Sequence, residues 1–125
     1  MVAGGSDAPI EIPNPFVGMH AAIFRPVPLE SHTESKSSSS DKSDSAATKF
    51  RSWHDKECLS KQQALELWTS NAAYTARAES RLGRLSKGFL ADFVVVNEDV
   101  WVHPERLNAP SVKPLQVWVA GVRRL

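Results

Sequence analysis

A helix is predicted over residues 15–25, PFVGMHAAIFR, because apolar side chains recur there at helical spacing. Asn14 stands just before this run and can cap it, Pro15 is tolerated in its first turn, and Pro26 ends it. The apolar side chains share one face of the helix: Phe16, Met19, Ala22 and Ile23. We expect other parts of a protein to cover that face.

Two further helices are predicted in the second half of the chain. The first covers KQQALELW, residues 61–68, and the pair Ser60 and Gln63 forms a capping-box pattern at its start. Residues 69–71, TSN, then interrupt the helix, since their side chains compete for backbone hydrogen bonds. The second covers AAYTARAES, residues 72–80, where several alanines favour close packing rather than chemistry.

The C-terminal part of the chain has the pattern of a small β-sheet. Residues 93–96, FVVV, form a β-branched run typical of a buried strand, and HPERL at 103–107 turns the chain. LQVWVAGVRRL, residues 115–125, is interpreted as two short strands joined at Ala120–Gly121. We therefore expect one sheet built from residues 91–97 and 114–125.

Residues 31–48, SHTESKSSSSDKSDSAAT, contain eight serines and no large apolar side chain. Such a segment buries too little surface to offset the entropy of ordering its backbone. It is predicted to be a disordered insert between two ordered parts of the chain.

Composition limits the classes of partner and compartment. The chain has 15 Lys and Arg against 14 Asp and Glu, which argues against a nucleic-acid-binding or anionic-membrane surface. Cys58 is the single cysteine, so an intrachain disulfide is excluded and a reducing compartment is indicated. No apolar run is long enough to span a membrane and no signal-peptide pattern is visible, so a cytoplasmic protein is expected.

Few of the residues that usually carry chemistry stand in a recognisable pattern. The sequence contains no HxH, HExxH, CxxC or GxSxG motif. We interpret His20 as a partly exposed helix residue, and we expect neither His54 nor Cys58 to act in a site. Lys87 between two glycines does not make a phosphate loop, because the GK[ST] ending is absent and a strand follows.

Asp7 is the acid whose surroundings best suit a functional site. It lies in GGSDAPIEIPNPF, residues 4–16, after a short strand-like start, with glycines before it and prolines after it. Judged on residue types alone, Asp7 still fits a turn or cap aspartate better than a catalytic one. One carboxylate also cannot hold a catalytic zinc, which needs about three protein ligands.

Three segments in order resemble the C-terminal end of the amidohydrolase family 3 metallohydrolases, within the urease-related amidohydrolase superfamily. Residues 5–25 resemble the glycine-serine-aspartate-x-proline loop of that family and the helix after it. Residues 59–100 resemble its helix pair and its LGxLxxGxxADFVV motif, and 117–125 match more weakly. The motif positions that match are Gly83, Leu85, Gly88, Ala91 and Asp92.

The resemblance implies an α/β fold: a C-terminal fragment of a (β/α)₈ metallohydrolase barrel plus part of its small β-sandwich domain. Residues 1–30 would be the last barrel strand, the catalytic loop and the helix, and 31–48 the Ser-rich insert. Residues 49–90 would hold the helix pair and 91–125 the β-sandwich strands.

The resemblance also implies the chemistry. Asp7 corresponds to the aspartate that binds the metal, takes a proton from the bound water and hands it to the leaving amine. The implied reaction is hydrolysis of non-peptide C–N bonds in small amide-like or cyclic amide substrates, with a divalent metal, zinc, as cofactor. Asp92 matches the family motif, but we interpret it as a structural acid that caps the Gly88 turn or pairs with an arginine.

The other metal ligands of the family, including its HxH, are absent from the sequence, so residues 1–125 alone are predicted to be inactive. Two alternatives are open: a small non-catalytic α/β module that binds a protein partner, or a remnant without function. The sequence leaves the oligomeric state undetermined.

Overall fold

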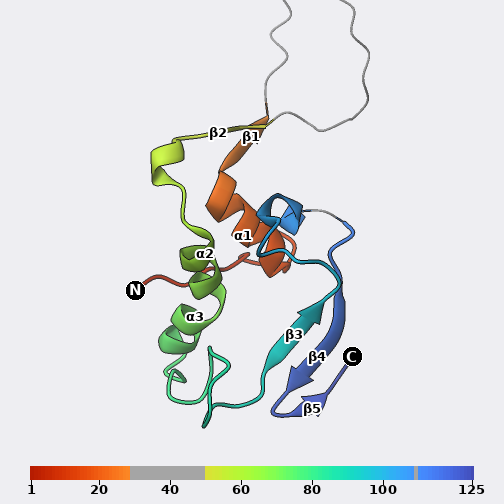
Figure 1. The fold of residues 1–125 in the computed structure, drawn as a ribbon. Coiled ribbons are helices and arrows are strands. Elements are labelled where there is room, and N and C mark those ends of the chain that lie inside the picture. Colours follow the sequence, from red (N-terminus) through yellow and green to blue (C-terminus); the bar gives the residue numbers. More distant parts are fainter. Residues whose placement is uncertain (29–49, 109) are drawn as a thin grey trace, which may run out of the picture.

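The computed structural model describes residues 1–28, 50–108 and 110–125, which form a mixed α/β arrangement (Figure 1). The predicted Ser-rich insert at 31–48 lies outside the described residues. Helices and a three-stranded antiparallel sheet are present, whereas the barrel and the β-sandwich implied by the resemblance stay predictions. The elements in chain order are α1 (Pro15–Phe24), β1 (Pro26–Pro28), β2 (Phe50–Ser52), η1 (Asp55–Glu57), α2 (Lys61–Trp68), α3 (Ser70–Thr75), β3 (Phe93–Val96), η2 (Pro104–Asn108), β4 (Pro114–Val119) and β5 (Val122–Arg123).

Helix α1 confirms the prediction for residues 15–25 to within one residue. The Asn14 side chain caps its start by accepting a hydrogen bond from the Phe16 backbone N–H at 3.0 Å. The helix ends at Phe24 because Arg25 adopts a left-handed conformation with φ of 41°. Beyond it, β1 pairs antiparallel with β2.

Helix α2 confirms the prediction for 61–68, including the capping box between Ser60 and Gln63. The prediction for the following helix was wrong in its bounds, since α3 covers Ser70–Thr75 instead of 72–80. Helix α3 starts earlier because Thr69 alone leaves the helical conformation between α2 and α3. It ends earlier because the backbone of Arg77 is left-handed, with φ of 54°.

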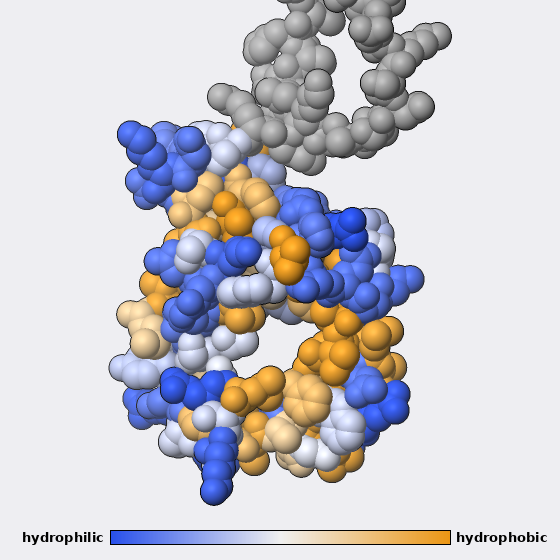
Figure 2. All heavy atoms as spheres, in the orientation of Figure 1, coloured by the Kyte–Doolittle hydropathy of each residue, from blue (hydrophilic) through white to orange (hydrophobic). Residues whose placement is uncertain are grey.

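Strands β3, β4 and β5 form the predicted sheet in that order, with antiparallel pairing throughout. The prediction that strand 93–96 is buried was wrong, because Val94 is 51% exposed and Val95 is 38% exposed. No helix packs extensively on this sheet within the described residues. Figure 2 shows an opening between the sheet and the helices, with apolar residues along the sheet side.

A small apolar core holds the helices together. Met19 of α1, Ala64 of α2 and Leu107 of η2 are its buried members. Partly buried side chains pack around them: Phe16, Ala22, Ile23, Trp68 and Val100. Phe16, Ala22 and Ile23 belong to the apolar face predicted for α1. Helix α2 and η2 therefore cover that face. No helix in the described part of the chain is long and apolar enough to cross a membrane.

Candidate functional site

Asp7 lies at the first position of a turn that joins the N-terminal segment to α1. Its backbone is left-handed, with φ of 50°, and its carbonyl accepts a hydrogen bond from the Ile10 N–H at 2.9 Å. The Ser6 carbonyl accepts a longer one, 3.3 Å, from the Glu11 N–H. These bonds fold residues 6–11 into a compact loop, in which Asp7 is exposed to solvent.

The segment before this loop is attached to the helix pair. The Gly4 N–H donates to the Leu67 carbonyl at 2.9 Å, and Asn71 Nδ2 donates to the Val2 carbonyl at 2.9 Å. Residues 2–4 therefore run along α2 and the start of α3, although more than 60 residues separate them in the sequence. Both ends of the Asp7 loop are thus fixed, by α2 on one side and by the capped start of α1 on the other.

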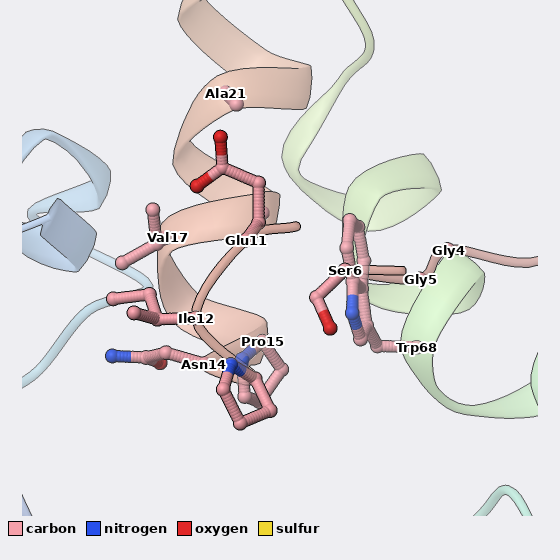
Figure 3. Close-up of a pocket in the computed structure, with 12 residues that line it drawn as sticks. Gly4, Gly5, Ser6, Glu11, Ile12, Asn14, Pro15, Val17, Ala21 and Trp68 are labelled. Carbon is pink, nitrogen blue, oxygen red and sulfur yellow. The ribbon is translucent and has the colours of Figure 1, made fainter. Parts of the chain in front are cut away.

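A groove of about 640 Å³ opens beside the Asp7 loop (Figure 3). Asp7 does not line it, but Ser6 and Glu11, at the two ends of the loop, do. The other lining residues come from the N-terminal segment, the loop, α1 and α2: Gly4, Gly5, Ile12, Pro13, Asn14, Pro15, Val17, Gly18, Ala21 and Trp68. The groove is open to solvent and largely apolar, with the Glu11 carboxylate as its charged group.

Sequence reasoning missed Ser6, Glu11 and Trp68 as neighbours of one groove. Ser6 and Glu11 flank Asp7 in the sequence, so the turn residues between them were a usable signal. For Trp68 no such signal existed, because its contact with the loop depends on how α2 packs.

The described residues do not form a metal site by themselves. No group of three His, Cys, Asp or Glu side chains gathers in residues 1–28, 50–108 and 110–125. Asp7 can therefore offer at most one ligand, and a complete zinc site does not fit the residues described here.

The histidines that the structure describes have other surroundings. His20 of α1 packs against Phe24, with ring centroids 4.8 Å apart, and partial burial lowers its pKa from the usual value. His54 is exposed and meets the Trp53 ring edge-on, whereas His103 Nδ1 lies 3.2 Å from Glu105 Oε1. His32 is outside the described residues. None of the three therefore shares a site with Asp7.

Asp92 has the structural role expected of it, but with a different partner. Its Oδ1 accepts a hydrogen bond of 2.6 Å from the Ala120 N–H, at the tight turn between β4 and β5. The Ala91 carbonyl accepts another, 3.1 Å, from the Gly121 N–H. The Ala91-Asp92 pair thus anchors the hairpin turn instead of capping the Gly88 turn or pairing with an arginine.

Gly83 of the same motif is required by a close backbone approach. It has φ of 92°, and a Cβ atom there would lie 2.8 Å from Ser70 Cα and 2.9 Å from Ala73 Cβ. Gly88 has a similar φ of 94° but open space around it. The motif therefore joins the helix pair to the sheet through one tightly packed glycine and one turn glycine.

Comparisons with known proteins identify the family to which the chain is similar. The model of the amidohydrolase family matches residues 1–124. The chain is also similar to "Putative amidohydrolase YtcJ" of Bacillus subtilis (strain 168), with 31% identity over 114 residues. That match covers 90% of this chain but 18% of the relative, so the chain spans less than a fifth of the relative's length. No solved structure matches the chain.

Proposed function

Because the chain belongs to amidohydrolase family 3, we propose that it contributes Asp7 to a hydrolase that cleaves non-peptide C–N bonds. Small amide-like or cyclic amide molecules are the proposed substrates. The observation that carries this proposal is the position of Asp7, exposed in the Gly-Ser-Asp-x-Pro loop, whose ends Ser6 and Glu11 line a largely apolar groove of about 640 Å³.

The proposed role of Asp7 is proton transfer. Hydrolysis forms a bond between a water oxygen and the carbonyl carbon, breaks the C–N bond, and requires one proton to move from the water to the leaving nitrogen. A carboxylate can accept that proton and return it to the amine, which contributes about 10²–10⁴-fold to a rate. Asp7 is suited to this because its side chain is exposed while its loop is held by backbone hydrogen bonds.

A divalent metal, zinc, is the proposed cofactor of the enzyme. Zinc in a catalytic site polarises a carbonyl and activates water, and it uses about three protein ligands. Since residues 1–28, 50–108 and 110–125 bring no such group together, the further ligands would come from polypeptide outside these residues.

We further propose that residues 1–30 belong to the end of a (β/α)₈ barrel and 91–125 to a β-sandwich. The exposed apolar side chains of the sheet support this, among them Val94, Val119 and Val122. So does the match to less than a fifth of the relative. The single cysteine is consistent with action in the cytoplasm.

The same exposed sheet also favours a second candidate function, a small module that binds a protein partner through this surface. The two candidates differ in what the chain does alone. A part of an enzyme should bind dyes that report exposed apolar surface, whereas an independent module should be monodisperse and melt cooperatively.

Purified residues 1–125 with added zinc test the enzymatic proposal. The chain should hydrolyse N-acyl amino acids no faster than an Asp7→Ala control, because it lacks the other ligands. Hydrolysis clearly above that control would contradict the proposal that the site is completed from outside this chain.

A further inference from the structure

The Trp68 ring lies against the backbone of two glycines from different parts of the chain. A Cβ atom built on Gly4 would lie 2.7 Å from Trp68 Cε2 and Cζ2, and one built on Gly18 would overlap Cζ2. Real Cβ atoms do not approach a ring this closely, so both positions require glycine while the ring stays in place. Trp68 thus packs between the N-terminal segment and α1, at the end of α2 (Figure 3).

This packing supports the segment that leads to Asp7. Gly4 lies three residues before Asp7, and its N–H is bonded to Leu67, the residue before Trp68. Residues 4–5 are both glycines, which have the greatest backbone freedom of any residue and no side chain with which to anchor themselves. Without the ring, one backbone bond and the exposed bond from Asn71 to Val2 would hold the segment.

We propose that Trp68 is a positioning residue for Asp7, an inference that rests on the proposed role of Asp7. The ring excludes water from the Gly4 backbone bond and fixes the distance between the N-terminal segment and α1. The Asp7 loop joins these two parts, so fixing them also fixes the loop. Positioning of this kind matters because a displacement of about 1 Å can cost about 100-fold in rate.

The test measures the order of the loop by NMR and does not depend on catalysis. In residues 1–125 labelled with ¹⁵N, the Asp7 amide should have an order parameter of about 0.85, and Trp68→Leu should lower it below about 0.6. The Gly4 and Gly18 signals should move, because they lose the ring current of the indole. Trp68→Phe keeps an aromatic ring and should restore part of the order.

Two controls separate positioning from general stability. Trp101→Leu removes a tryptophan that is half exposed and contacts Lys61, and it should leave the Asp7, Gly4 and Gly18 signals unchanged. The order parameter of the Ala73 amide in α3 should stay high in Trp68→Leu, since a purely structural loss would lower both.

A second pair of variants applies if Trp68→Leu fails to fold. Gly4→Ala places a methyl group against the ring and should disorder Asp7, whereas Gly5→Ala enters open space and should not. Equal Asp7 order in the Gly4→Ala and Gly5→Ala variants, or in Trp68→Leu and the unaltered chain, would overturn the proposal. The proposal would also be overturned if the Gly4 and Gly18 amides of the unaltered chain had the chemical shifts of an unstructured peptide. If Asp7 had no part in catalysis, none of these NMR outcomes would change. The proposal for Trp68 and the proposal for Asp7 can therefore fail independently.

Discussion

The helical region and the sheet region of this protein are held together in different ways. In the helical region, α1, α2 and η2 enclose a shared core in which Met19 is 8% and Leu107 is 5% exposed. In the sheet region, backbone pairing and the Asp92 contact hold β3, β4 and β5, and apolar side chains of these strands stay exposed. The Asp7 loop belongs to the helical region.

The two regions therefore differ in how much of their stability can come from their own packing. Burial of apolar surface is the main favourable term in folding, so a region with a core can retain its arrangement without further partners. A three-stranded sheet with uncovered apolar positions depends on additional packing for much of its stability. We therefore expect the loop that carries Asp7 to be better ordered than the sheet.

The largest expected effect comes from the core of the helical region. Met19→Ala removes a buried side chain and should lower the free energy of unfolding by about 2–5 kcal/mol. Val94→Thr keeps a β-branched residue at an exposed sheet position and should change it by no more than about 0.5 kcal/mol. Urea unfolding of both variants measures the difference. A loss in Val94→Thr as large as that in Met19→Ala would remove the distinction between the regions.

The next largest loss in the free energy of unfolding is expected at Gly83, compared with Gly88 of the same LGxLxxG pattern. Gly83→Ala and Gly88→Ala both place a side chain at a positive φ, which costs about 1–2 kcal/mol in each. At Gly83 the new methyl group also meets the backbone of α3, which should add about 1–3 kcal/mol. The same urea measurement applies, and equal losses at the two positions would show that the close approach to Ser70 is absent.

A smaller effect is expected at the hairpin turn of the sheet. Asp92→Ala removes the acceptor for the Ala120 N–H and should cost about 1–2 kcal/mol, mostly as local opening of the turn. Hydrogen exchange of the Ala120 amide should accelerate in Asp92→Ala, while Asp92→Asn retains an acceptor and should exchange at a rate closer to the unaltered chain. Unchanged exchange in Asp92→Ala would contradict the structural role of Asp92.

The smallest effect is the pH dependence at His20. Burial against Phe24 disfavours the charged imidazole, so the folded pKa lies below the usual value of 6.5 and the unfolded chain binds the proton more readily. The stability linked to His20 is therefore present above pH 6.5 and is lost as the pH falls through the folded pKa. An NMR titration should give a midpoint below 6.5 that rises in Phe24→Ala. A midpoint that does not rise in that variant would exclude burial by Phe24 as the cause.

Local patterns predicted the elements well, because caps and turns depend on neighbouring residues. Asn14, Ser60 with Gln63, and Ala120–Gly121 each have the role that their sequence context indicated. The exposure of β3 was mispredicted, because it depends on what packs against the strand. The bounds of α3 were mispredicted, because the left-handed backbone of Arg77 leaves no mark in the sequence pattern. The contact of Trp68 with Gly4 and Gly18 was likewise invisible in the sequence, since it joins three distant segments.

Asp7 is proposed to be an active-site carboxylate in a site that polypeptide outside this chain completes. A chimera provides the test: residues 1–125 replace the matched region of the Bacillus subtilis relative, and hydrolysis of a panel of N-acyl amino acids is measured with added zinc. We expect the chimera to be active, and we expect Asp7→Asn to lower its kcat by about 100-fold or more without unfolding it. A folded Asp7→Asn chimera as active as the unaltered one would contradict the claim.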